Sequence, residues 1–324
     1  MLDVVCFGEI LWDMFETRLQ GGVYRRELGG APANVATGLA RLGAKVAVVG
    51  GVGRDSFGDA LVAHLASDGV DVRFVVKLEN RTGLTFVTRD AAGEPQFLFY
   101  RHDSADLAVR ASHVVPAMGR ARWVLVGSST LMTRELAAAT ARFLDVARRA
   151  GASLFVDLNV RAHLWPSRRA MERAIGKIVR RADVVKASDA DLRAVSGRAA
   201  GLRWLERHAP QATWLVTRGS GVASAIGAHG SVDVPALRAR CIDATGAGDA
   251  FIAGALGTLV AARAVPGYGA WSTPGVWRTA LRAGHIMGKK AVSRPGAVAG
   301  LVDLGRVRAV IASAAPRGQR ESAS

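Results

Sequence analysis

Short runs of β-branched and other apolar residues alternate along the chain with longer segments whose apolar residues recur at helical spacing. The short runs predict strands at Val4–Gly8, Lys45–Val49, Trp123–Val126, Ser153–Asp157, Val184–Lys186, Thr213–Thr217 and Gly221–Ile226. The amphipathic segments predict helices at Pro32–Leu42, Ser56–Ala66, Arg134–Arg149 and Ser167–Arg181. Because strands that alternate with helices usually pair in parallel, we expect an α/β fold: a mostly parallel central sheet with helices on both faces.

Two segments, Leu11–Leu28 and Arg81–His102, interrupt this alternation with strand-like stretches such as "GLTFVTRD" and "PQFLFYR" and no helical pattern. We expect antiparallel strands that project from the main sheet. They would form a small lid over the carboxyl ends of its strands, where ligands of such sheets bind. A purely structural edge hairpin is the alternative. The end of the chain, residues 314–324, is small and polar and is expected to be disordered.

The formal net charge of +16 raises the question of a nucleic-acid partner. The positive residues are mostly arginine and are spread along the whole chain, without a long basic run interleaved with aromatic residues. We therefore expect no nucleic-acid partner, although the charge favours anionic substrates such as nucleoside triphosphates. The apolar stretch Ala250–Ala262 is too short to cross a bilayer, and Cys6 and Cys241 are the only cysteines. We expect no membrane association and a cytoplasmic location.

The segment Asp243–Phe251, "DATGAGDAF", places two glycines and two carboxylates directly before an apolar helical run. Backbone N–H groups in the first turn of a helix attract anions, and small residues let a ligand approach them. The segment is not a Walker A loop, because no Lys-Ser/Thr pair follows the glycines. Asp249 would repel a phosphate unless it takes a proton from an attacking hydroxyl group. The alternative is that Asp249 only caps the helix.

Two further glycine-rich segments precede predicted helices. In "LGGAPANVATGLARLG", Pro32 suits the first helical turn and Asn34 stays polar near its open end. The Gly29–Gly30 pair has no side chains and so permits a hydroxylated ligand close to the backbone. In "VVGGVGRDSFG" the glycines miss the dinucleotide pattern, and we expect a tight turn between strand and helix, capped by Asp55 or Ser56.

In this order, "GGAPANVA", "VGGVGRDSFG" and "DATGAGDAF" resemble the ribokinase-like (PfkB-type) carbohydrate kinases. The segments "RTGLTFVT", "FLFYRHDSADL", "DLNVRAHLW" and "KASDADL" are similar to the fructokinase branch. The resemblance implies a kinase domain over residues 1–313, with a lid drawn from residues 11–28 and 81–102. It also implies ATP-dependent phosphorylation of a sugar, D-fructose to fructose 6-phosphate. The alternatives within the family are 2-keto-3-deoxygluconate kinase, ribokinase, and nucleoside or aminoimidazole-riboside kinase.

The resemblance also implies roles for individual residues. Asp249 would be the general base, and the backbone of Gly246, Ala247 and Gly248 would form the anion hole. The implied sugar-binding residues are Asp13, Gly29, Gly30, Asn34, Tyr100, Arg101, Asn159 and Arg161. The implied ATP-binding residues are Lys186, Thr217, Gly219, Gly221 and Gly248. Asp191 would hold Mg²⁺ through water, and a K⁺ site would comprise Asp243, Thr245 and carbonyl groups of Ala291, Arg294, Gly296 and Gly300.

The sequence departs from the family at several positions. Leu158 stands where fructokinases usually have proline, and Asp191 stands where glutamate is usual in the magnesium-associated motif. "TRGSGVAS" is one residue tighter than the usual glycine spacing, which affects Gly221. The exposed edge of a β lid would allow a homodimer. Outside the kinases, a NAD-dependent oxidoreductase is disfavoured because no dinucleotide fingerprint is present.

Overall fold

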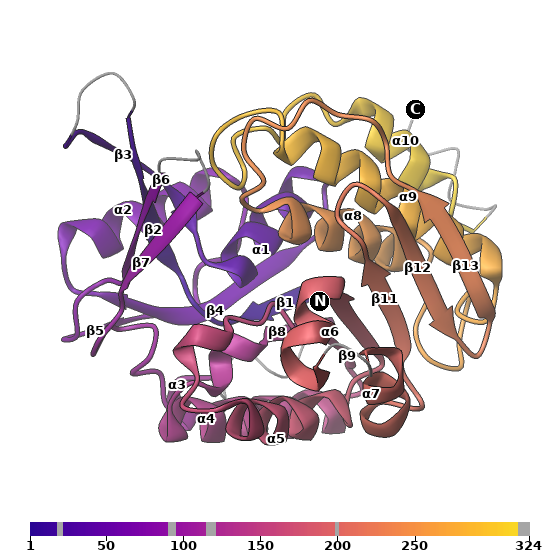
Figure 1. Ribbon diagram of the computed structural model, residues 1–324, viewed down its shortest axis with the longest axis horizontal. Helices are drawn as coiled ribbons and strands as arrows, with labels where there is room; N and C mark the ends of the chain where they lie inside the picture. Colours follow the sequence, from indigo (N-terminus) through magenta and orange to yellow (C-terminus); the bar gives the residue numbers. More distant parts are fainter. Residues whose placement is uncertain (18–21, 90–94, 115–120, 198–200, 317–324) are drawn as a thin grey trace.

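The computed structural model describes residues 1–17, 22–89, 95–114, 121–197 and 201–316, so most of the polar tail lies outside the described residues (Figure 1). Within them, one large sheet has the strand order β13 (Gly230–Pro235), β12 (Val222–Gly227), β11 (Thr213–Thr217), β10 (Val184–Ser188), β9 (Ser153–Asp157), β8 (Ala121–Gly127), β1 (Leu2–Phe7), β4 (Val46–Gly53) and β5 (Val75–Leu78). The neighbours from β11 to β5 are parallel, whereas β12 and β13 are antiparallel additions at one edge. The expected α/β fold is confirmed.

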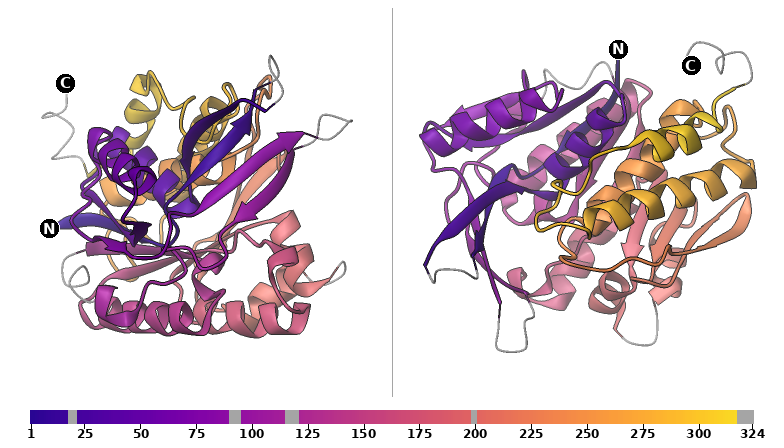
Figure 2. Two further views of the ribbon diagram at one scale, coloured as in Figure 1. Left: turned by 90° about the vertical axis from the view of Figure 1, so that its left-hand side faces the viewer. Right: turned by 90° about the horizontal axis from the view of Figure 1, so that it is seen from above.

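Alternation of side chains along the strands divides the core into two layers. Val4 and Cys6 face one layer, and Val5 and Phe7 face the other. The first layer is covered by α1 (Ala31–Arg41), α2 (Ser56–Ser67), α8 (Ala247–Ala261), α9 (Pro274–Ala291) and α10 (Gly305–Ala312). The second is covered by α3 (Ala111–Val114), α4 (Arg134–Arg149), α5 (Arg168–Val179), α6 (Asp189–Ser196) and α7 (Gly201–His208). The three layers are visible in Figure 2.

The helix α8 is apolar on all sides, because it packs against α1, α9 and α10 as well as lying over the sheet. Its residues from Asp249 to Leu259 are buried. This includes the carboxyl group of Asp249, a type of side chain that is ordinarily ionised and exposed to water. No helix in the described part of the chain is long and apolar enough to span a membrane.

A second sheet projects from the first and has the order β3 (Tyr24–Gly29), β2 (Leu11–Glu16), β6 (Leu84–Arg89) and β7 (Pro95–Tyr100). The expected lid is therefore present, and Figure 1 shows it on one side of the molecule. The expectation of purely antiparallel strands was wrong, because β2 and β6 pair in parallel. Each of these two strands follows a parallel strand of the main sheet, β1 or β5, so both leave it in the same direction.

The strand that contains "VVGGVG" was predicted to end at Val49, and that boundary was wrong. The expected tight turn between strand and helix is confirmed, because only Arg54 and Asp55 separate Gly53 from the start of α2 at Ser56. The strand β4 continues through Gly50 and Gly51 to Gly53. A Cβ atom on Gly50 would lie 2.5 Å from the carbonyl oxygen of Gly8, so glycine permits close backbone packing inside the strand. The expected cap is confirmed, since the Asp55 carboxylate accepts a hydrogen bond from the Gly58 N–H at 2.8 Å.

The packing of α8 on α9 generates a stability prediction. A Cβ atom on Gly254 would lie 2.5 Å from the Ala283 carbonyl oxygen, whereas one on Gly257 would make ordinary contacts at 3.4 Å or more. Gly254→Ala should therefore lower the free energy of unfolding by about 1–3 kcal/mol through overpacking. Gly257→Ala, the matched control, should raise it by up to about 1 kcal/mol through helix propensity. Urea unfolding checks both, and equal stability of the two variants would contradict the packing.

Candidate active site

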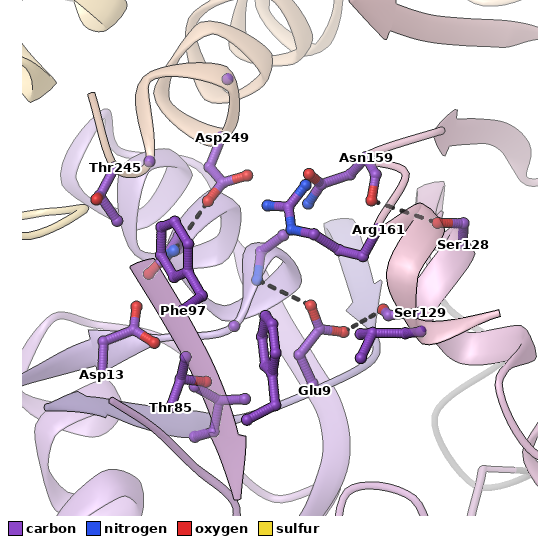
Figure 3. A pocket seen from close by; sticks show the side chains of 18 of the residues that line it. Glu9, Asp13, Thr85, Phe97, Ser128, Ser129, Asn159, Arg161, Thr245 and Asp249 are labelled. Carbon is purple, nitrogen blue, oxygen red and sulfur yellow. Dashed lines mark hydrogen bonds between the residues drawn. The ribbon is translucent and has the colours of Figure 1, made fainter. Parts of the chain in front are cut away.

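The lid and the carboxyl ends of the central strands enclose a cavity of about 320 Å³ (Figure 3). The lid contributes Asp13, Thr85, Phe97 and Phe99. The ends of the central strands and the loops after them contribute Glu9, Ser128, Ser129, Asn159, Arg161 and Lys186. The helices α1 and α8 point their N-terminal turns at the same space, through Asn34 and Asp249. A cavity therefore lies where a ligand site was expected, beneath the lid at the carboxyl edge of the sheet.

Glycine and proline shape the start of α1. Gly30 has φ +95°, and a Cβ atom there would lie 2.3 Å from the Glu9 carbonyl oxygen. The Glu9 carboxylate accepts hydrogen bonds from the Ala31 N–H at 3.1 Å and from the Ser129 hydroxyl group. One turn into α1, the Asn34 side-chain amide donates to Asp249 at 2.8 Å. Sequence reasoning missed Glu9 and Ser129, because neither belongs to a recognisable motif.

The start of α8 is open toward the cavity. Gly246 adopts the left-handed conformation (φ +72°), and α8 has no side chain that caps its first turn. Gly246 and Gly248 line the cavity, as the anion-hole prediction requires. Ala247 does not line it, and its N–H donates to the Ala244 carbonyl oxygen at 3.2 Å. Because the Ala247 N–H already has a partner, an anion in the cavity would be attracted by the backbone N–H groups around Gly248 and by the dipole of α8.

The Asp249 carboxyl group is 9% exposed, and its pKa is raised from 3.8 to about 7. Burial is the largest cause, and the nearby Asp157 carboxylate adds to the increase. The hydrogen bond from Asn34 and the positive charge of Arg161 act in the opposite direction. A carboxyl group with this pKa exchanges its proton near neutral pH, as a general base must.

Asp13 is a second carboxyl group of this kind. Burial and the neighbouring Asp249 carboxylate raise its pKa to about 7, while a hydrogen bond with Thr85 opposes the increase. The ionised Asp249 carboxylate therefore makes the proton of Asp13 harder to lose. Thr85 pairs directly with Asp13 across β2 and β6, and it was not identified from the sequence.

The other predicted sugar-binding residues fall into two groups. Asn159 and Arg161 line the cavity, and Figure 3 shows the Arg161 side chain pointing toward Asp249 and Asn159. Arg101 also lines it, and its guanidinium group is 2.5 Å from the buried Asp106 carboxylate. Tyr100 does not line the cavity and is 61% exposed on the opposite face of the lid. Gly29 does not line it either.

The absence of a side chain at Gly29 nevertheless serves the site, because a Cβ atom there would lie 2.5 Å from Asp13 Cγ. On the lid strand β7, Phe97 and Phe99 face the cavity in place of Tyr100. The alternation of side chains along a strand explains this, since odd and even positions point to opposite faces.

A second cavity of about 720 Å³ lies on the other side of the α8 N-terminus. It is lined by Thr217, Gly219, Ser220, Ala236, Leu237, Arg238, Ala239, Cys241, Ala244, Ala247, Gly248, Phe251, Gly284, His285, Gly288, Lys289 and Val292. Gly248 lines both cavities, so a ligand in the second could reach into the first beside Asp249. Of the residues predicted to bind a nucleotide, Thr217 and Gly219 lie here, Lys186 lies in the first cavity, and Gly221 lines neither.

Asp243 and Asp191, the two carboxylates of the expected cation sites, have different surroundings. The Asp243 carboxylate accepts hydrogen bonds from the Thr245 backbone and hydroxyl groups and from the Gly296 N–H at 2.9 Å. It is 4% exposed and has no cationic side chain within ion-pair distance among the described residues. This arrangement joins the loop before α8 to the loop that follows α9. Of the remaining candidates, Ala291 is the last residue of α9, and Arg294 and Gly300 lie in the loop after it.

Asp191 lies in neither cavity lining. One of its oxygen atoms accepts from the Val160 N–H and the other from the Ser188 N–H and hydroxyl group, all at 2.7 Å. It forms a capping box with Ser188 at the start of α6. Its position thus supports the loop that carries Asn159. No cluster of three or more metal-ligating side chains occurs among the described residues.

Comparison with known proteins decides the family. Residues 1–303 match the pfkB family of carbohydrate kinases. The chain belongs to this family. The PfkB chain is 37% identical to fructokinase-1 of Zea mays over 273 residues, which cover 79% of this chain and 83% of the maize protein.

Solved structures agree with this assignment. The PfkB chain resembles the fructokinase of Xylella fastidiosa with bound ATP, with a TM-score of 0.83 and 32% identity, over 96% of this chain and 98% of that one. It also resembles the fructokinase of Vibrio cholerae O395 bound to fructose, ADP and a calcium ion. There the TM-score is 0.85 and the identity 27%, over 96% of this chain and 99% of that one. The protein is therefore a carbohydrate kinase.

The raised pKa of Asp249 predicts a pH-dependent effect of its replacement on stability. Because the folded-state pKa of about 7 exceeds the ordinary value of 3.8, the neutral acid stabilises the fold at low pH. That stabilisation is lost as the pH rises from about 4 through 7. Relative to the wild type, Asp249→Asn should therefore gain free energy of unfolding over this range, at about 1.4 kcal/mol per pKa unit, and level off above it.

Urea unfolding at several pH values between 4 and 9 measures this difference. Asp233→Asn, which removes an exposed carboxylate on β13, is the matched control and should show no comparable trend. A difference between Asp249→Asn and the wild type that stays constant with pH would contradict the raised pKa.

Proposed function

We propose that this PfkB kinase is a fructokinase, which transfers the γ-phosphate of ATP to D-fructose and forms fructose 6-phosphate. The observation that carries the proposal is the position of Asp249. It lies at the N-terminus of α8, bound to Asn34, where the cavity beneath the lid meets the second cavity. The fructokinases of maize and Vibrio cholerae, the latter solved with fructose and ADP, support the choice of sugar.

The sugar would occupy the cavity beneath the lid. Asp13 and Asn34 supply a carboxylate and an amide for its hydroxyl groups, and Phe97 and Phe99 cover it from the lid. Closure of the lid keeps water from competing with the sugar hydroxyl for the phosphoryl group. Asp249 takes the proton of the attacking hydroxyl group as the oxygen–phosphorus bond forms, and its pKa of about 7 suits this transfer.

The nucleotide would occupy the second cavity, with Thr217 and Gly219 near its phosphates and the terminal phosphate beside Gly248. The α8 dipole and its first-turn amides attract the charge of the transferring group. Positioning and charge neutralisation are the main requirements of phosphoryl transfer, and Arg161 adds a positive charge from the loop after β9.

Two cations fit this scheme in different ways. Mg²⁺ usually keeps several waters and binds substrate phosphates, which suits a site without a cluster of metal-ligating side chains among the described residues. Such an ion would travel with ATP and neutralise its phosphate oxygens. K⁺ would suit the buried Asp243 carboxylate, which lacks a cationic side-chain partner in the described part of the chain. It would neutralise that charge and steady the loop before α8.

A coupled ADP-release assay tests the proposal. D-fructose should be phosphorylated with a higher kcat/KM than D-ribose, 2-keto-3-deoxygluconate or an aminoimidazole riboside, and K⁺ should raise the rate over Na⁺. Asp249→Asn should lower kcat by at least ~10²-fold, because it removes the general base while keeping the side-chain volume. Asp233→Asn should retain full activity.

Two outcomes would count against the proposal in different ways. Activity with D-ribose or a riboside, but not with D-fructose, would replace the substrate while leaving the kinase intact. Near-normal turnover by a folded Asp249→Asn protein would remove the assignment of the base.

We further propose that the kinase forms a homodimer through the lid. The edge strand β7 exposes Leu98 (58%) and Tyr100 (61%), and the Tyr100 ring packs 5.1 Å from Phe86 on the outer face. The edge position of β7 beside an apolar surface favours pairing with a second copy. Light scattering should give about twice 34.0 kDa, and Leu98→Glu should give the monomer mass. Tyr268→Glu, at an exposed position outside the lid, is the control. A monomeric wild type would contradict the dimer.

A further inference from the structure

The Glu9 carboxyl group connects three segments of the protein beside the cavity beneath the lid. Glu9 lies two residues after the end of β1 and is 8% exposed. One of its carboxylate oxygen atoms accepts a hydrogen bond from the N–H of Ala31, the first residue of α1, at 3.1 Å. The other accepts one from the hydroxyl group of Ser129, in the 3₁₀ helix η2 (Ser128–Leu131) that follows β8. The carboxyl group is therefore held in one orientation from two sides.

These two hydrogen bonds leave the Glu9 carboxylate with unused acceptor capacity. The two oxygen atoms of an ionised carboxylate can accept about four hydrogen bonds. Each oxygen atom of Glu9 accepts one from the described residues, and the side chain also lines the cavity (Figure 3). A buried polar group is costly unless its hydrogen bonds are made. A ligand that donates a hydrogen bond to Glu9 is therefore favoured at this point of the cavity.

The charges around Glu9 indicate the kind of group that it would bind. The negative charges of Glu9 and Asp249 both raise the pKa of Asp13, so an anionic group of a ligand is disfavoured near these carboxyl groups. Arg101 also lines the cavity, but its guanidinium group is paired with the buried Asp106. No cationic side chain forms an ion pair with Glu9 in the described part of the chain. A neutral donor, such as a hydroxyl group, fits this position best.

Glu9 and Ser129 lie at the end of the cavity away from the proposed base. Figure 3 shows them on one side of the cavity and Asp249 on the other. The nearby chain positions that also line the cavity include Leu11 and Met132, which are apolar. Glu9 and Ser129 therefore supply polar contacts at an end that is otherwise partly apolar. A sugar whose reacting hydroxyl group lies at Asp249 would reach this end with its opposite side.

The chemistry of the ketose decides which hydroxyl group would arrive there, if the fructokinase function proposed above holds. In the furanose form of D-fructose, the two carbon atoms beside the ring oxygen each carry a hydroxymethyl group. One holds the C6 hydroxyl group that reacts, and the other holds the C1 hydroxyl group. D-ribofuranose has only the first of these hydroxymethyl groups. A residue that binds the C1 hydroxyl group therefore distinguishes a ketohexose from an aldopentose.

We propose that Glu9 is a specificity-determining residue that accepts a hydrogen bond from the C1 hydroxyl group of the ketose. Ser129 is the positioning residue that holds the Glu9 carboxyl group for this contact. The proposal rests on the fructokinase function. A sugar without the C1 hydroxyl group would fill the cavity but leave a buried carboxylate oxygen atom without its donor. Such an unmade hydrogen bond to a charged group costs more than the loss of an apolar contact.

A pair of sugars that differ by one hydroxyl group tests the proposal. The wild type should have a kcat/KM for D-fructose that is ~10–10²-fold higher than for 1-deoxy-D-fructose. Glu9→Gln keeps the side-chain volume and an acceptor for the Ala31 N–H, and it should reduce this preference ~10-fold, because a hydrogen bond to a neutral amide is weaker. Ser129→Ala should reduce the preference less. The double variant should match Glu9→Gln, since Ser129 acts through Glu9.

Glu79→Gln is the matched control, because it removes an exposed carboxylate that pairs with Arg54 and lines neither cavity. It should keep the preference of the wild type. Equal use of the two sugars by the wild type would show that the proposal is wrong. So would a Glu9→Gln protein that loses kcat/KM for both sugars by the same factor, since Glu9 would then only support the start of α1. A wild type that does not phosphorylate D-fructose at all would overturn the fructokinase function as well, so the two failures are distinguishable.

Discussion

The site depends on the burial of one carboxyl group at the N-terminus of a buried helix. Asp249 lies where the amide dipoles of α8 attract negative charge and where almost no water remains to solvate it. Burial raises its pKa to about 7, and Asn34 donates a hydrogen bond that keeps the charged form accessible. The carboxyl group is therefore a competent proton acceptor near neutral pH because of the fold around it.

The surrounding architecture provides what this position requires. The helices α1, α9 and α10 and the central sheet bury α8 on all sides. Glycines at positions 38, 254 and 284 have no side chains and so allow the helices of this layer to pack closely. The lid closes the remaining side with Asp13, Thr85 and two phenylalanines. Gly248, which has no side chain, lines both cavities, so the two cavities adjoin next to Asp249.

The alternation of strands and helices predicted the fold class and the position of the lid, because strand and helix periodicities are local properties of the sequence. Local patterns could not predict the parallel pairing of β2 with β6, which depends on the directions of β1 and β5. The motifs pointed to Asp249 and Asn34, which the structure brings together in the cavity beneath the lid. They did not predict Glu9 and Ser129, which lie in the segments after β1 and β8, or Thr85 on β6, and none of these residues has a sequence pattern of its own. Tyr100 and Asp191 show the converse: alternation along β7 and a capping box direct these two side chains away from both cavities.

The most direct test of this account is a ¹³C NMR titration of the carboxyl groups in protein labelled at aspartate. The Asp249→Asn variant identifies the signal of Asp249, and the titration gives its pKa without reference to activity. The account predicts a signal that titrates near pH 7, coupled to a second signal that the Asp13→Asn variant removes. A pKa for Asp249 near its ordinary value of 3.8 would contradict the central claim that burial prepares this carboxyl group for proton transfer.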